Sequence, residues 1–171
     1  ERVDALLAGS DPTRHAGGTG LTAAWLESPL GPMLAVSDER ALVMLEFWER
    51  RGLVEAVEGL TRTAPVVPGR SAPIDSVERE LSDYFAGRRG EFATPLALAG
   101  SAFQLRVWDE LRRIAPGRTL SYLGLAQRLG DPRAVRAVAQ ANGANRLAVV
   151  VPCHRVIAAD GGLTGYAAGV E

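Results

Sequence analysis

The sequence predicts a protein of mixed α/β class, with a three-stranded antiparallel sheet and helices first and a mainly helical part after it. Three observations indicate this class. Short β-favouring runs separated by turn residues fill residues 21–48, apolar residues then recur at helical spacing, and beyond residue 100 the pattern becomes helix, glycine-containing turn, helix. A chain of 171 residues with 47% hydrophobic residues is long enough for one domain or two small ones with a buried core.

The first half begins with a polar, glycine-rich stretch, and we expect residues 1–20 to be a loose leader or linker. The runs LTAAWLES, GPMLAVS and ALVMLEFW follow, separated by Ser-Pro, Gly-Pro and Asp-Glu-Arg breaks. Breaks of this kind are typical of turns between strands, so we predict three antiparallel strands.

Two helices are expected after the strands. The first is a short amphipathic helix with three apolar side chains on one face, Leu53, Val57 and Leu60. The segment TAPVVPG predicts a loop, and the next helix ends at Gly87 and carries apolar residues at helical spacing, namely Ile74, Val77, Leu81, Tyr84 and Phe85. The segment ATPLAL predicts a short extended stretch that leads out of this half.

Three helices are expected in the second half. The first opens with Ser101 and Gln104 in a capping-box pattern and buries Phe103, Val107, Leu111 and Ile114. The second has Ser121 as its N-cap and Gly130 after its end. The third begins with an Asp131 N-cap and Pro132 at the first helical position, and Gly143 stops it. The last two form a helix-turn-helix arrangement.

Charge is distributed unevenly along the chain, although the formal net charge is only −1. Residues 1–100 contain ten arginines and fifteen acidic residues, whereas residues 101–156 contain nine arginines and three acidic residues. A basic second half favours a polyanionic partner such as DNA.

The third of these helices carries a cationic stripe, formed by Arg133, Arg136 and Gln140, beside a row of small residues, Ala134, Ala137 and Ala141. Small side chains let a helix backbone approach a grooved polyanion closely, so this face is our candidate for DNA binding. A solvated arginine face is the alternative. Val135 and Val138 lie on another side and are core candidates.

The only cysteine, Cys153, lies between Pro152 and the pair His154 and Arg155. A single cysteine excludes an internal disulfide and a zinc site with several cysteines. A buried cysteine is most often inert, but cationic and proton-accepting neighbours raise the thiolate fraction and favour a nucleophile. A Cys-His thiol hydrolase is an alternative that the spacing weakens, because neighbours in an extended chain point to opposite sides.

The segments PCHRVI, DGGLTGY and RAVAQANGANRLAVVV resemble the O6-alkylguanine-DNA alkyltransferases, also called methylated-DNA–protein-cysteine methyltransferases. The resemblance is strong from about Phe103 to Gly169 and faint over residues 21–98. The segment AVAQANGANRLAVVVPCHRV is most similar to the C-terminal domain of the Ada adaptive-response protein. It implies a ribonuclease-H-like N-terminal subdomain over residues 21–98. It also implies a winged-helix-like C-terminal domain over residues 99–171, which binds DNA and accepts the alkyl group.

The resemblance implies a role for each residue that matches the family's motifs. Cys153 would be the nucleophile and alkyl acceptor, and His154 would take its proton through a water. Asn145 would brace the turn before the active-site strand, and Tyr122 would donate toward the guanine ring and help turn the target phosphate. Arg136 would fill the stack after the base leaves it. The base pocket would be framed by the chain from Val156 to Tyr166, and Ala167 stands where relatives carry serine.

The implied reaction is irreversible transfer of a methyl group from O6-methylguanine, and also O4-methylthymine, to Cys153 in a single turnover. The expected partner is double-stranded DNA bearing O6-alkylguanine, with no cofactor, no metal, no membrane and no obligate protein partner, in a monomer of the bacterial cytoplasm. A glutamate that completes the family's relay would fall beyond Glu171, and we expect slow transfer without it. Besides the thiol hydrolase, the alternative is a non-catalytic regulator that senses DNA damage through the helix-turn-helix.

Overall fold

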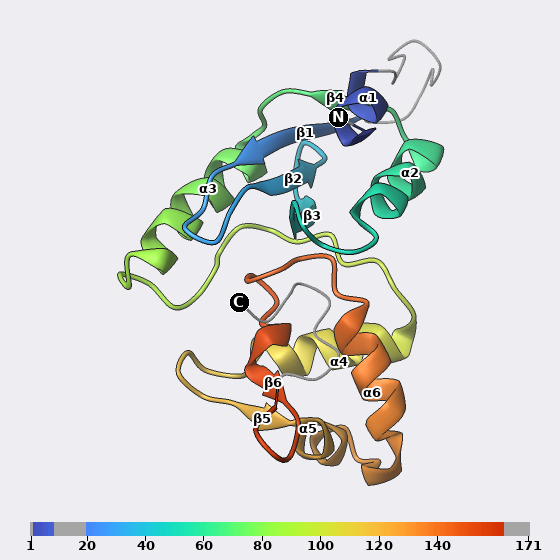
Figure 1. The fold of residues 1–171 in the computed structure, drawn as a ribbon, viewed down its shortest axis with the longest axis vertical. Helices are drawn as coiled ribbons and strands as arrows, with labels where there is room; N and C mark the ends of the chain where they lie inside the picture. The colour runs from blue at the N-terminus through green and yellow to red at the C-terminus, as the bar shows by residue number, and fades with distance from the viewer. Residues whose placement is uncertain (1, 9–19, 163–171) are drawn as a thin grey trace. The chain divides into compact units, whose positions relative to one another are not determined.

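The computed structural model describes residues 2–8 and 20–162 (Figure 1). The chain divides into two compact units, residues 1–97 and residues 98–171, and each is described by itself. Within the described ranges, no helix combines the length and the apolar composition that a membrane span requires.

The first unit is built on a four-stranded sheet with the order β3-β2-β1-β4. The strands β1 (Leu21–Leu26), β2 (Met33–Ser37) and β3 (Leu42–Phe47) pair antiparallel, which confirms the three predicted strands. The prediction of a loop for TAPVVPG is wrong, because this segment contains a fourth strand, β4 (Val66–Pro68), which runs parallel to β1. Proline lacks an N–H for the ladder, so Pro68 suits the end of this short edge strand.

Both faces of this sheet are covered, since all five residues of β2 are buried although alternate side chains point to opposite faces. On one face Leu34 and Val36 join an apolar cluster with Leu53 and Val57 of α2 (Leu53–Thr63). α3 (Ala72–Phe85) contacts β2 from the other side, where the hydroxyls of Ser37 and Ser71 are 2.6 Å apart.

The prediction of a loose leader over residues 1–20 is wrong for its first part, because residues Arg2–Ala8 form the helix α1. Its Val3 and Leu7 are buried in the same cluster as Val57. α1 contacts both α2 and β4, as Figure 1 shows. These two apolar side chains, four residues apart, attach the start of the chain to the core.

The segment ATPLAL is extended, as predicted. The N–H of Leu42 donates to the carbonyl of Pro95 and the N–H of Ala97 donates to the carbonyl of Leu42, each at 2.8 Å, so the segment lies along the β3 edge. The buried Glu80 carboxylate holds its start by accepting from the N–H and the hydroxyl of Thr94.

The second unit is mainly helical and begins with α4 (Ala102–Arg112). The predicted capping box is present, because the Ser101 hydroxyl accepts from the N–H of Gln104 and the Gln104 side chain accepts from the N–H of Ser101. Val107, Leu111 and Ile114 are buried as expected, while Phe103 is only half-buried.

The helix-turn-helix follows α4. β5 (Leu120–Ser121) leads into α5 (Tyr122–Arg128), then a short 3₁₀ turn, η2 (Pro132–Ala134), leads into α6 (Val135–Gly143). Ser121 caps α5 as predicted. The prediction of Asp131 as the N-cap of the third helix is wrong, because Asp131 caps the turn η2, and the N-cap of α6 is Ala134 without a side-chain bond. Gly143 is the last residue of α6 rather than the residue after it. The chain continues through η3 (Cys153–Arg155) into β6 (Val156–Ile157), which pairs parallel with β5. A mixed α/β chain with an antiparallel N-terminal sheet and a helical C-terminal part is confirmed.

Candidate active site

Two tight turns present Cys153 at the start of η3. The N–H of Cys153 donates to the carbonyl of Val151 at 2.8 Å, and Pro152 between them has φ −80° and ψ 63°, the geometry of an inverse γ-turn. The 3₁₀ turn then closes when the N–H of Val156 donates to the carbonyl of Cys153. Proline already fixes φ in this range, so the sequence fixes the backbone just before the thiol. Cys153 itself is half-buried and forms no disulfide.

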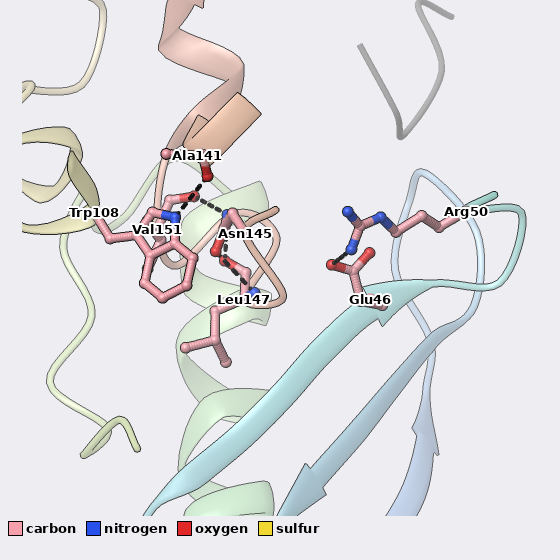
Figure 2. A network of polar contacts seen from close by, with 7 residues as sticks. All are labelled: Glu46, Arg50, Trp108, Ala141, Asn145, Leu147 and Val151. Atoms are coloured by element: carbon pink, nitrogen blue, oxygen red, sulfur yellow. Dashed lines mark hydrogen bonds and ion pairs between the residues drawn. The ribbon is translucent and has the colours of Figure 1, made fainter. Parts of the chain in front are cut away.

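The loop that leads to this turn, between α6 and Pro152, is held from inside by Asn145. Its Nδ2 donates to the carbonyls of Val151 at 2.9 Å and Leu147 at 3.4 Å, and its Oδ1 accepts from the N–H of Leu147 at 3.0 Å (Figure 2). Asn145 is buried, and its Oδ1 is the acceptor for the N–H of Leu147, while its Nδ2 adds a second donor to two carbonyls that already accept main-chain N–H groups. The bracing role predicted for Asn145 agrees with this geometry.

The same loop contains a strained residue. Val149 has φ 69°, and the N–H of Val150 donates to the carbonyl of Ala148 at 2.8 Å, which makes a γ-turn of the rare, strained hand. A β-branched residue in this region costs about 1–3 kcal/mol, and such costs concentrate at functional sites. The strain lies four residues before the thiol.

His154 follows the thiol within η3. Burial lowers the pKa of His154 to about 4, and the positive charge of Arg155 acts in the same direction. The imidazole is therefore neutral at pH 7 and has a nitrogen lone pair that can accept a proton.

Arg155 anchors the turn to the end of α4. Its buried guanidinium donates to the carbonyl of Ile114 at 2.6 Å. A buried cation is costly unless it is hydrogen-bonded, and this main-chain acceptor satisfies part of the group. The sequence places Arg155 beside the thiol, and the structure adds that its head group is turned to α4.

The pairing of β5 with β6 brings Tyr122 near the thiol, because Tyr122 begins α5 directly after β5 and η3 directly precedes β6. Burial raises the pKa of Tyr122, the nearby Cys153 raises it further, and the side chain of Asn142 acts in the opposite direction. The phenol is therefore protonated at neutral pH and can donate a hydrogen bond close to Cys153.

α6 separates a buried face from an exposed one. Val138, Ala141 and Asn142 are buried, while Arg136 and Ala137 are exposed. The other members of the predicted DNA-binding face are the exposed Arg133 and Gln140 and the half-buried Ala134. The prediction that places Ala141 in the same row of small residues is wrong, because Ala141 is buried. The structure therefore leaves the predicted cationic stripe accessible, as a DNA-binding face requires.

The base pocket is described only in part. Val156 is buried and lies at the start of β6. Tyr166 and Ala167, which we also assigned to the pocket, lie outside the described residues.

Two residues of this site were missed by the sequence reasoning. Trp108 is buried in α4 and its Nε1 donates to the carbonyl of Ala141 at 2.8 Å, which fixes the end of α6 (Figure 2). Asn142 is buried and its Nδ2 donates to the carbonyl of Cys153 at 3.4 Å. A signal for Asn142 existed, because it follows Val138 by four residues and is thus a polar residue on the apolar face of its helix.

Comparison with known proteins identifies the family. Residues 21–98 match the family described as "6-O-methylguanine DNA methyltransferase, ribonuclease-like domain", and residues 102–171 match its "DNA binding domain". The chain belongs to the O6-methylguanine-DNA methyltransferase family. The resemblance inferred from the sequence motifs is thereby confirmed, and the ribonuclease-like match agrees with the subdomain type that it implied.

Relatives and solved structures of this methyltransferase family cover most of the chain. A methylated-DNA–protein-cysteine methyltransferase of Methanosarcina acetivorans is 39% identical over 145 residues, covering 85% of this chain and 88% of that protein. One of Salmonella typhimurium is 41% identical over 155 residues, with 85% and 87% covered.

Among solved structures, the O6-methylguanine methyltransferase of Mycobacterium tuberculosis aligns with a TM-score of 0.75 at 37% identity, covering 88% of this chain and 86% of that one. The same organism's protein, solved as "OGT in complex with DNA", aligns with a TM-score of 0.74 at 36% identity, with 86% and 85% covered.

Proposed function

We propose that this chain repairs alkylated DNA by direct reversal, transferring the methyl group of O6-methylguanine irreversibly to Cys153. Membership of the methyltransferase family supports this activity. Within the chain itself, the observation that carries the proposal is the η3 turn, where one thiol and a neutral imidazole share a braced backbone.

The chemistry is a displacement at carbon. The sulfur of Cys153 forms a bond to the methyl carbon, the carbon–O6 bond breaks, and its electron pair goes to the guanine. We propose that His154 takes the thiol proton through a water, while Tyr122 donates a hydrogen bond toward the departing ring. The proton lost by the thiol is regained by the guanine, and an imidazolium of low pKa returns it readily. The thioether has no leaving group that water could use, so each molecule acts once.

DNA binding is proposed for the exposed face of α6. A basic helix with small residues suits contact with phosphates, which holds DNA independently of sequence. The target atom is inside the duplex, so the base must be extruded, at a cost of a few kcal/mol. We propose that Arg136 offsets this cost by filling the gap left in the stack.

The cellular setting is also a proposal. A nucleophile that acts as a free thiol needs a reducing compartment, which supports a cytoplasmic protein. We propose that the chain works as a monomer, with double-stranded DNA as its partner.

Stoichiometry tests the proposal against its two alternatives. Incubation with excess DNA containing O6-methylguanine should add one methyl group per protein molecule and then stop. A thiol hydrolase would turn over repeatedly, and a non-catalytic sensor would bind the DNA without acquiring a methyl group.

A further inference from the structure

Asn142 is a buried amide in the last turn of α6 for which no role has yet been assigned. It is 4% exposed, and its Nδ2 donates to the carbonyl of Cys153 at 3.4 Å. That carbonyl also accepts the N–H that closes η3. Asn142 therefore bonds directly to the peptide unit of the nucleophile.

The amide is not explained by packing. Within the described residues, the Oδ1 atom of Asn142 is buried and has no hydrogen-bond partner. A buried acceptor without a partner costs about 1–3 kcal/mol, which an apolar side chain of similar volume would avoid. The orientation is set by the Cys153 carbonyl, because turning the amide over would place two acceptors against each other.

The same amide also bears on Tyr122. Burial raises the pKa of the Tyr122 phenol, the side chain of Asn142 lowers it, and the nearby Cys153 raises it. Tyr122 belongs to α5 and Cys153 to η3, so Asn142 of α6 bonds to the main chain of Cys153 and also influences the pKa of Tyr122. Its helix carries Arg136 on the exposed face, six residues earlier.

We propose that Asn142 is a positioning residue for methyl transfer, whose amide holds the main chain of Cys153 and the phenol of Tyr122 in register. The role rests on the proposed function, because it concerns the geometry of that reaction. Asn142 does not touch the methyl group. It acts through Cys153, which takes the methyl group, and through Tyr122, which donates toward the departing guanine.

The experiment measures single-turnover transfer from a methylated duplex at increasing DNA concentration for the wild type, Asn142→Leu and Val138→Ala. Leucine keeps the approximate volume and removes the amide. Val138→Ala is the matched control, since it destabilises the same buried face of α6 and removes no polar contact. Asn142→Ala provides a second variant should the leucine variant fail to fold.

We expect the maximal rate of Asn142→Leu to fall by about 10- to 100-fold, the range that misplacement of reacting groups by up to about 1 Å produces. The DNA concentration at half-maximal rate should stay within about twofold, and Val138→Ala should react at the wild-type maximal rate. An ultraviolet titration of the phenols, assigned with Tyr122→Phe, should show the pKa of Tyr122 raised further in Asn142→Leu, because the opposing contact is lost.

A wild-type maximal rate in both Asn142 variants, or a change in the half-maximal DNA concentration alone, would overturn the positioning role and leave the proposed function standing. Equal slowing in Val138→Ala would also overturn it, because the loss would then follow from stability. A wild type that transfers no methyl group would instead overturn the proposed function itself.

Discussion

Replacing His154 with glutamine should change how the stability of the protein depends on pH. The folded-state pKa of His154 is about 4, below its ordinary value of 6.5, because the imidazole is buried and lies near Arg155. As the pH falls below 6.5, His154 becomes protonated in the unfolded chain, whereas in the folded chain it stays neutral until about pH 4. Stability from the neutral imidazole is therefore complete above pH 6.5 and is lost on acidification.

The difference between 6.5 and about 4 corresponds to about 3 kcal/mol at most, and partial exposure of the side chain reduces the expected loss to about 2 kcal/mol. Urea unfolding at pH values between 7.5 and 4.5 measures it for the wild type and His154→Gln. Both proteins keep His15 and every carboxylate, so the difference between their two pH profiles isolates His154. We expect the wild type to lose about 2 kcal/mol more than the variant over this range. Parallel profiles would refute the reasoning.

Three further predictions concern the DNA-binding face and the braced loop. Arg136→Ala should slow transfer most on fully paired duplex and least on mismatched or single-stranded DNA, because a mismatched base costs less to extrude; equal losses on all three substrates would leave Arg136 an ordinary phosphate contact. Arg133→Ala should instead weaken binding evenly and reduce the salt slope by about one unit in a titration series. Asn145→Ala should lower the free energy of unfolding by about 1–3 kcal/mol in urea titrations, since it removes the acceptor of the buried Leu147 N–H and a second donor from the Val151 carbonyl.

Helix ends were predictable because the signals are local. Ser101 with Gln104, and Ser121 before α5, cap helices through bonds that span three residues. Such bonds depend little on the rest of the fold. The three antiparallel strands were predictable for a similar reason, since turn residues separate them.

The elements that depend on distant partners were not predictable. β4 has three residues, one of them proline, and is a strand only because β1 lies beside it. α1 begins a polar, glycine-rich stretch, and its Val3 and Leu7 are buried in the core. Neither segment has enough periodic pattern of its own to indicate the structure that tertiary contacts impose.

The residues of the site also divide into those that local sequence predicts and those that depend on tertiary contacts. The linear motif around Cys153 and His154 identified the reacting groups, and the family pattern pointed to Asn145. The positive φ of Val149 and the contact from Asn142 to the Cys153 carbonyl arise when the loop after α6 folds back on that helix. No spacing rule along the chain contains that information.

The most direct test of methyl transfer to Cys153 is the intact mass of the protein after incubation with DNA containing O6-methylguanine, followed by peptide mapping. Cys153→Ser serves as the control, which should bind the same DNA and acquire no methyl group. We predict a gain of one methyl group per molecule, located on Cys153, with no further repair once the protein is consumed. An unchanged mass with continued loss of O6-methylguanine, or a methyl group on another residue, would contradict the proposed mechanism.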